Sequence, residues 1–254
     1  MALLRTEHLT KRFGGLLALN DLSVEIAEGR VTGLIGPNGS GKTTFINTVT
    51  GVYKPDMGSV FFKGKPIGGA EPHVIARVGI ARTYQRIRLF ERMTALQNVL
   101  VARHVWYRSN MAGVLVNSAR LRGEEADHTQ EAMALLELVG LRDKADSLPG
   151  SLPYGHRRNL EIARALALKP SLLLLDEPAA GMNREEFLAL QRLILRLKRE
   201  GMTILLVEHT MELVESVADH VVVLNFGQKL AEGSFDLISK DKNVVEAYLG
   251  KEEL

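Results

Sequence analysis

The sequence contains no cysteine, so it can form neither a disulfide framework nor a thiolate metal site. It also lacks a long apolar run: the longest, at residues 172–175 and 204–207, fall far short of the roughly 20 residues that cross a bilayer. Its first residues do not combine a basic start with an apolar core, so no signal peptide is indicated. The net charge is only +2, which gives no electrostatic footprint for nucleic acid. If the protein serves a membrane process, we expect another chain to span the membrane.

Short apolar runs alternate with helical patterns along the sequence, whose 46% apolar and 24% charged residues are ordinary for a globular protein. Bare apolar runs of this kind are typical of parallel strands that are covered on both faces. A mostly helical stretch, residues 94–141, contains the apolar run 111–116, which is either a contact for a membrane partner or a buried helix turn. We expect strands at 3–9, 22–26, 31–35, 59–63, 172–175, 203–207 and 221–224, and helices at 42–49, 124–139, 157–168, 185–199 and 211–217.

A phosphate-binding loop is the strongest motif in the chain. Residues 36–43 match G-x-x-x-x-G-K-[ST] in full, after an expected strand and at the start of an expected helix. Glycines let the backbone approach phosphate oxygens, while the helix directs unpaired N–H groups at the anion. The alternative, a glycine-rich turn, would produce this motif by chance in about one chain in a hundred. We expect Lys42 to reach the β- and γ-phosphates and Thr43 to bind Mg²⁺. The expected nucleotide-binding residues of this loop are Gly36, Pro37, Asn38, Gly39, Ser40, Gly41, Lys42, Thr43 and Thr44.

Two adjacent acids follow the apolar run 172–175. An acidic pair after a strand is, on its own, most often a solvated turn. Beside a phosphate-binding loop, such a strand delivers an aspartate to the Mg²⁺ shell, opposite the hydroxyl of Thr43. We therefore expect Asp176 to bind the metal and Glu177 to act as the general base that orients the attacking water.

Residues 152–166, just ahead of Asp176, resemble the signature helix of ATP-binding cassette (ABC) subunits, whose general pattern is LSGGQ followed by a basic, alanine-rich helix. Alone, Gln85 would be a solvent-exposed residue, His209 a surface or helix-cap residue, and Phe13 a core residue. The resemblance implies other roles: Gln85 senses Mg²⁺ and the γ-phosphate, His209 contacts the γ-phosphate, and Phe13 stacks on adenine. These motifs occur in the family's order over nearly the whole chain.

The resemblance implies an α/β fold: a RecA-like P-loop NTPase core with a mainly parallel sheet, an antiparallel β subdomain and a helical subdomain over residues 90–160, all in one domain, 1–254. It implies hydrolysis of ATP with Mg²⁺ between two ATPase subunits arranged head to tail. It further implies transmembrane permease subunits as partners, a substrate-binding protein as an indirect partner, and a peripheral location on the cytoplasmic face of the inner membrane.

The chain departs from the family pattern at its signature. Pro153 stands where the family has a serine that donates to the partner's ATP, Tyr154 replaces a glycine, and His156 replaces the glutamine. Proline has no hydroxyl and no N–H, although it is tolerated near a helix start. Asn183 replaces the acid of the dimer-contacting loop, residues 179–183. These departures resemble the ATPases of branched-chain amino acid importers, in which two different ATPase chains usually pair. We expect the site completed by this chain's signature to be the weaker of two.

Three alternatives remain at this stage. An ABC ATPase for another cargo, such as urea, amides or lipid, would have the same motifs, because the ATPase subunit does not touch cargo. A soluble ABC ATPase of DNA repair or translation would usually carry two cassettes or a long coiled-coil insert, and this sequence has neither. A small-molecule kinase with a phosphate-binding loop should lack the signature helix.

Overall fold

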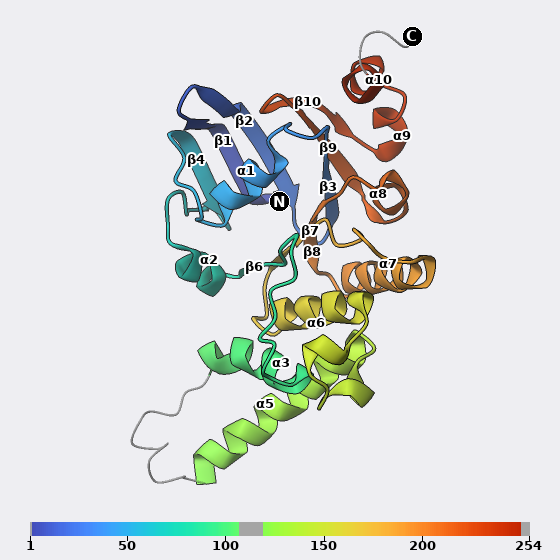
Figure 1. Ribbon diagram of the computed structural model, residues 1–254. Helices are drawn as coiled ribbons and strands as arrows, with labels where there is room; N and C mark the ends of the chain where they lie inside the picture. The colour runs from blue at the N-terminus through green and yellow to red at the C-terminus, as the bar shows by residue number, and fades with distance from the viewer. Residues whose placement is uncertain (1, 107–118, 250–254) are drawn as a thin grey trace. The chain divides into compact units, whose positions relative to one another are not determined.

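The computed structural model describes residues 2–106 and 119–249, so the apolar run 111–116 lies outside the described residues (Figure 1). The chain forms two compact units. The first unit, called here the phosphate-loop unit, comprises residues 1–82, 171–180 and 194–254. The second, called the helical unit, comprises residues 83–170 and 181–193. No helix in the described part of the chain combines the length and the apolar character that a membrane crossing requires.

The phosphate-loop unit is built on a six-stranded sheet in the order β10-β9-β3-β8-β7-β6. All neighbours in it are parallel except β10 and β9. The central strands are wholly buried, which explains why they appear in the sequence as bare apolar runs. The strands are β3 (Val31–Ile35), β6 (Ile80–Arg82), β7 (Leu172–Asp176), β8 (Thr203–Val207), β9 (His220–Asn225) and β10 (Gln228–Gly233).

Both faces of this sheet are covered. One apolar cluster joins sheet residues such as Leu34 to Phe45 and Ile46 of helix α1 and to the antiparallel sheet. A second cluster joins Ile35 and Val223 to the helices near the C-terminus. The prediction of a parallel sheet with two covered faces is therefore correct. The helices of this unit are α1 (Lys42–Val49), α2 (Pro72–Val78), α8 (Met211–Val217), α9 (Phe235–Ile238) and α10 (Lys242–Leu249).

A four-stranded antiparallel sheet, in the order β2-β1-β4-β5, packs against α1 in the same unit (Figure 1). Its first two strands form a hairpin that turns at Gly14 and Gly15. The expected strands at 3–9 and 22–26 fall within this sheet, and the structure extends each of them to 12 residues. The strand expected at 59–63 runs from Met57 to Phe62, so Lys63 lies outside it. The strands are β1 (Ala2–Phe13), β2 (Leu16–Ala27), β4 (Met57–Phe62) and β5 (Lys65–Pro66).

The helical unit contains no strand among its described residues. Helix α3 begins with a capping box, in which Thr94 and Gln97 each accept the other's backbone N–H. Helix α7 begins in this unit and ends in the phosphate-loop unit. The elements are α3 (Ala95–Arg103), α5 (Ala119–Leu138), α6 (Tyr154–Leu166), α7 (Arg184–Arg199) and the 3₁₀ turns η1 (His104–Trp106), η2 (Arg142–Lys144) and η3 (Pro149–Ser151).

Helix α6 begins at Tyr154, three residues before the expected start at residue 157. Pro153 is its N-cap residue, and its carbonyl accepts the N–H of Arg157 at 3.0 Å. Pro153, which was expected to precede the helix, is therefore its N-cap residue. The first N–H groups of a helix have no acceptor within the helix, so the missing N–H of proline removes no helical hydrogen bond.

Candidate functional site

The loop between β3 and α1 has a backbone that only glycine can adopt at two positions. A Cβ on Gly36, which has φ +148°, would lie 2.2 Å from the carbonyl oxygen of Leu224. A Cβ on Gly41, which has φ +106°, would lie 2.7 Å from the carbonyl oxygen of Ala18. These two glycines allow the loop to turn back against β9 and β2 and to present the first N–H groups of α1.

Two polar groups of this loop fit an anion. The Nζ atom of Lys42 donates to the carbonyl oxygens of Gly36 at 2.7 Å and Pro37 at 3.0 Å. Burial lowers the pKa of Lys42, while the nearby charges of Glu177 and Asp176 raise it. The Oγ atom of Ser40 is buried, and it has no hydrogen-bond partner among the described residues. A phosphate would supply both side chains with a charged acceptor, so the loop fits a nucleotide.

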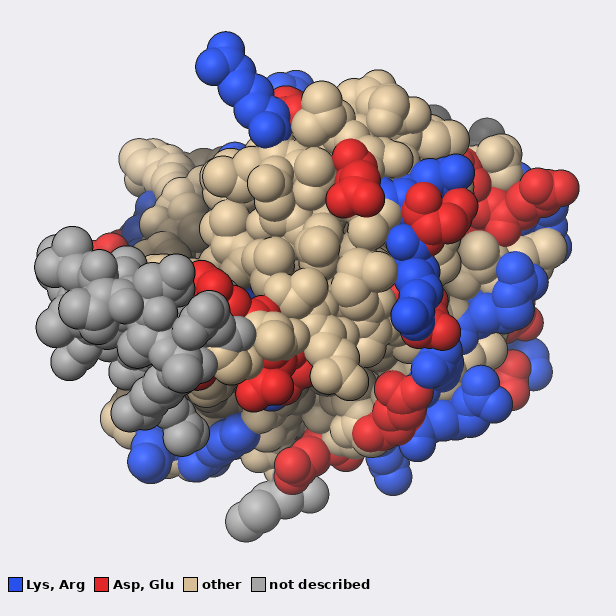
Figure 2. Space-filling view, turned by 90° about the horizontal axis from the view of Figure 1, so that it is seen from below, with Lys and Arg blue, Asp and Glu red and all other residues tan. Residues whose placement is uncertain are grey.

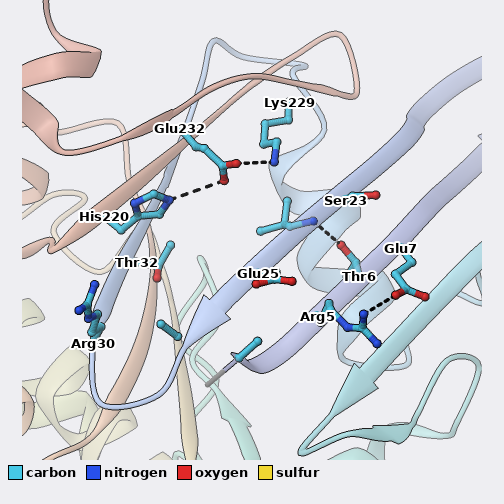
Figure 3. Close-up of a pocket in the computed structure, with 13 residues that line it drawn as sticks. Arg5, Thr6, Glu7, Ser23, Glu25, Arg30, Thr32, His220, Lys229 and Glu232 are labelled. Atoms are coloured by element: carbon cyan, nitrogen blue, oxygen red, sulfur yellow. Dashed lines mark hydrogen bonds and ion pairs between the residues drawn. The ribbon is translucent and has the colours of Figure 1, made fainter.

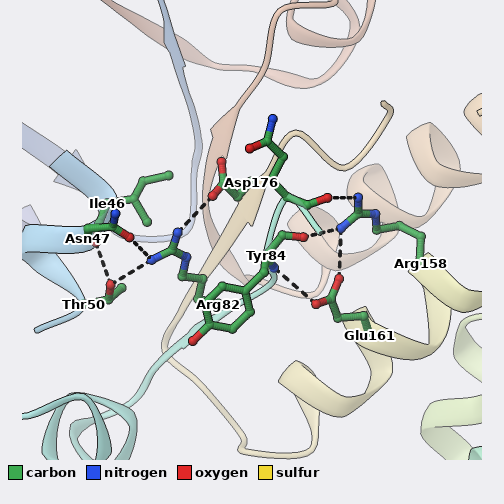
Figure 4. Close-up of polar contacts among 9 residues, drawn as sticks. Ile46, Asn47, Thr50, Arg82, Tyr84, Arg158, Glu161 and Asp176 are labelled. Carbon is green, nitrogen blue, oxygen red and sulfur yellow. Dashed lines mark hydrogen bonds and ion pairs between the residues drawn. The ribbon is translucent and has the colours of Figure 1, made fainter. Parts of the chain in front are cut away.

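The predicted metal residue Asp176, at the end of β7, forms a buried ion pair with Arg82, at the end of β6 (Figure 4). Nη2 of Arg82 lies 3.0 Å from Oδ2 of Asp176. Nη1 of Arg82 donates to Asn47 Oδ1 at 2.7 Å and to Thr50 Oγ1 at 3.2 Å, near the end of α1. The arginine thus joins the helix of the phosphate loop to the strand that carries the predicted metal ligand. Sequence reasoning gave Arg82 no role.

The predicted base Glu177 and the predicted switch residue His209 lie in direct contact. Nε2 of His209 is 2.8 Å from Oε1 of Glu177. Glu177 has φ +47°, a left-handed conformation that strains a residue with a side chain. Its backbone N–H donates to the carbonyl oxygen of Val207 at 2.8 Å, so the end of β7 is fixed to the end of β8.

Phe13, the predicted adenine platform, is the last residue of β1 and is 41% exposed, which excludes the alternative of a core residue. Its ring meets that of Tyr53 edge to face, with 5.0 Å between centroids. The Nζ atom of Lys11 lies 5.4 Å from the centroid of the Phe13 ring. Part of the Phe13 ring is therefore exposed, while Tyr53 and Lys11 contact the rest, and its role as an adenine platform stays a prediction.

No cluster of three His, Asp or Glu side chains suited to hold a metal ion occurs among the described residues. Asp176 of the phosphate-loop unit and the exposed Thr43 at the start of α1 are the predicted metal residues there. Gln85, the third, belongs to the helical unit. Its role at the phosphate loop therefore stays a prediction.

In the helical unit, α6 holds the segment that contains Gln85 through a buried ion pair of Arg158 and Glu161 (Figure 4). Arg158 donates to the carbonyl oxygens of Tyr84 at 2.5 Å and Gln85 at 2.8 Å. Glu161 accepts the N–H groups of Tyr84 and Arg88, each at 3.3 Å. Burial raises the pKa of Glu161, while Arg158 and the two N–H groups lower it. The signature-like helix and the glutamine segment are thus tied together within one unit.

The first turn of α6 is also fixed. Glu186 Oε1 accepts the N–H of Gly155 at 2.9 Å, and a Cβ on Gly155 would lie 2.5 Å from that carboxylate. Glu186 Oε2 accepts the N–H of Asn183 at 3.0 Å, while Asn183 Oδ1 accepts the N–H of Glu186 at 3.0 Å. Asn183 therefore serves as a capping residue for α7, a role for which asparagine is well suited.

A cavity of about 700 Å³ lies elsewhere in the phosphate-loop unit, between the antiparallel sheet and strands β3, β9 and β10 (Figure 3). Several of its charged side chains pair with one another: Arg5 with Glu7, and both His220 and Lys229 with Glu232. The cavity contains none of the predicted site residues.

On the face drawn in Figure 2, acidic and basic side chains lie next to one another. That face has no broad surface of one sign that would follow a nucleic-acid backbone.

Known proteins resemble the chain over its full length. A profile of the family described as ABC transporter matches residues 19–180. The chain is 44% identical over 250 residues to the high-affinity branched-chain amino acid transport ATP-binding protein BraF of Pseudomonas aeruginosa, and 40% identical to LivG of Escherichia coli, covering 98% of each chain in both cases. It matches a solved ATP-binding cassette of an ABC transporter, in its ADP conformation, with a TM-score of 0.86 and 36% identity over 99% of this chain and 100% of that one. The expected family and fold class are thereby confirmed. This chain belongs to the ABC transporter family and is an ATP-hydrolysing subunit of a transporter.

Proposed function

We propose that the chain powers the uptake of branched-chain amino acids, as a peripheral subunit on the cytoplasmic face of the inner membrane. The observation that carries this proposal is the full-length likeness to two ATP-binding proteins that are named for branched-chain amino acid transport. The departures at Pro153, His156 and Asn183, which resemble that branch, support the same cargo.

The phosphate-loop unit would hold the nucleotide. Gly36, Pro37, Asn38, Gly39, Ser40, Gly41, Lys42, Thr43 and Thr44 would surround its phosphates, and Phe13 would stack on its base. Thr43, Asp176 and Gln85 would hold Mg²⁺. When bound, this ion neutralises charge that develops on the phosphates. The buried, unpaired Oγ of Ser40 and the inward-turned Nζ of Lys42 support this assignment.

Hydrolysis would depend on Glu177 and His209. Glu177 would accept a hydrogen bond from water and take its proton as that water attacks the γ-phosphate. His209 would contact the γ-phosphate, and its 2.8 Å contact with Glu177 would keep the base oriented. Lys42 would stabilise the charge on the phosphoryl oxygens.

The partners would be a second, different ATPase chain, transmembrane permease subunits and, indirectly, a substrate-binding protein. Hydrolysis would separate the two ATPase chains because it removes γ-phosphate contacts that they share. The helical unit, with Gln85, would pass this opening to the permease. The tie between α6 and the glutamine segment supports such a coupling within the unit.

Isolation of the intact complex tests this function. The complex should contain permease subunits and a second ATPase, and reconstituted vesicles should take up leucine, isoleucine or valine when ATP and the binding protein are supplied. ATPase activity should rise with the permease present and should not respond to DNA or ribosomes. Uptake of urea, amides or lipid in place of the amino acids would contradict the proposed cargo, while stimulation by DNA or ribosomes would contradict transport.

A further inference from the structure

Glu208 is a buried acid between the last residue of β8, Val207, and the predicted switch residue His209. Only 2% of it is exposed. Acids are rarely buried to this extent without compensating partners, because the charged form loses its hydration. Burial indeed raises the pKa of Glu208, while backbone hydrogen bonds lower it and the charge of Glu177 raises it again.

The Glu208 carboxylate accepts hydrogen bonds from backbone N–H groups on two loops. Oε1 accepts the N–H of Ala179 at 2.8 Å, two residues after Glu177. Oε2 accepts the N–H of His209 at 3.0 Å and that of Thr210 at 3.3 Å. One side chain therefore connects the loop that follows β7 to the loop that follows β8.

These loops carry the two side chains that must meet. Glu177 has the strained φ of +47°, and its N–H is held by Val207, the residue before Glu208. Its backbone is thus fixed on both sides, by Val207 at Glu177 itself and by Glu208 at Ala179. On the other loop, Glu208 fixes the backbone of the residue that carries the imidazole. The 2.8 Å contact between His209 and Glu177 lies between these anchors.

We propose that Glu208 is a positioning residue for ATP hydrolysis, which sets the distance between Glu177 and His209 by holding both loops through their backbone N–H groups. The inference rests on the roles proposed above for Glu177 and His209. Glu208 itself would touch neither nucleotide nor water.

The chemistry requires a carboxylate of this length. A glutamine at the same place has one acceptor oxygen and an NH₂ group, which would face backbone donors on one of the two loops. An aspartate keeps both oxygens, but it is one methylene shorter and reaches only one loop. Either change should let the loops shift relative to each other. A shift near 1 Å at a reacting centre can lower a rate by about 100-fold.

The test compares Glu208→Gln and Glu208→Asp with wild type in the assembled complex, using ATP turnover and ATP binding. We expect kcat to fall about tenfold to 100-fold in both variants, while the dissociation constant for ATP changes by less than about twofold. Glu215→Gln, which removes an acid at an exposed position of α8, is the matched control and should leave both quantities unchanged.

A double variant separates positioning from a general structural role. If Glu208 sets the distance between Glu177 and His209, Glu208→Gln should lower kcat by a clearly smaller factor in a His209→Ala background than in wild type. A kcat within about twofold of wild type in a folded Glu208→Gln or Glu208→Asp protein would overturn the proposal, and so would full additivity with His209→Ala. Glu177→Gln is measured in parallel: normal turnover there would refute the proposed base, whereas its loss together with a normal Glu208→Gln rate would refute only this inference.

Discussion

At the scale of single residues, the buried ion pair of Arg82 and Asp176 holds the phosphate-loop unit together around its predicted metal ligand. The side chains are only 9% and 5% exposed. Because removal of one partner leaves a buried charge without compensation, Arg82→Ala should lower the free energy of unfolding by about 3 kcal/mol. Arg82→Lys should recover part of this, because a lysine keeps the charge but cannot bond Asn47, Thr50 and Asp176 with one planar group.

Urea denaturation of the purified chain, followed by circular dichroism, measures this prediction. Arg86→Ala is the control, because Arg86 is exposed and lies four residues further along the chain. Equal urea midpoints for Arg82→Ala and Arg86→Ala would show that the ion pair contributes no stability.

The pairing of Glu177 with His209 leads to a second prediction at this scale. Glu177→Gln should lower kcat by about 100-fold to 10,000-fold, because an amide cannot take the proton of the attacking water. ATP should still bind, since the phosphate loop is untouched.

Lys42→Ala should instead weaken ATP binding, because Lys42 is the buried cation of the loop. Nucleotide titration and phosphate release measure the two effects, and a fully active Glu177→Gln enzyme would exclude Glu177 as the base.

At the scale of elements, the C-terminal helix α10 lies beside the phosphate loop, and residues of both line one pocket. Partial burial of Tyr248 raises the pKa of its hydroxyl to about 12, while the nearby backbone of Gly36 lowers it. In the unfolded chain the pKa of a tyrosine is 10.0, so between pH 10 and pH 12 the hydroxyl of Tyr248 keeps its proton in the folded protein and loses it in the unfolded chain. The stabilisation that results is complete below pH 10 and is lost as the pH rises through about 12.

Tyr248→Phe should therefore reduce the loss of stability between pH 10 and pH 12. The measurement is the difference in melting temperature between wild type and variant at several pH values. Tyr53→Phe is the matched control, because Tyr53 lies in the same unit and packs against Phe13 away from this contact. Identical pH profiles for wild type and Tyr248→Phe would mean that α10 does not depend on this proton.

The elements that sequence could predict are those with a strong local pattern. The runs at β7 and β8 and the phosphate loop need no knowledge of distant residues. Strand β6 has only three residues, too few for a period, and the polar β10 is an edge strand that takes its form from pairing with β9. Within the site, Arg82 and Glu208 could not be given roles, because Asp176 lies 94 residues from Arg82 in sequence and Ala179 lies 29 residues from Glu208. The local pattern shows only that Arg82 is the last residue of β6 and that Glu208 directly follows β8, and neither position indicates which residues the side chain contacts.

At the scale of the whole molecule, the start of α6 bears on how two ATPase chains share their sites. Pro153 offers no hydroxyl and no N–H, and the N–H of Gly155 is taken by Glu186. If this end of α6 faces the partner's ATP, as the family resemblance implies, it presents fewer donors than a signature with serine. Loss of a single such donor lowers a rate by about 100-fold to 1,000-fold in comparable sites. The complex should then hydrolyse ATP mainly at the site formed by this chain's own phosphate loop.

Restoring the signature in a complex that carries Glu177→Gln tests this asymmetry directly. Glu177→Gln silences the site at this chain's phosphate loop, so the remaining turnover comes from the partner's phosphate loop and this chain's signature. Adding Pro153→Ser and His156→Gln should raise that remaining rate at least about tenfold, because a hydroxyl donor returns to the γ-phosphate. The same two substitutions with Glu177 intact should raise the total rate by no more than about twofold, since a second site is added to a working one. If the remaining rate stays unchanged after both substitutions, the signature is not what limits the reciprocal site, and the two sites would have to differ for a reason that lies in the partner chain.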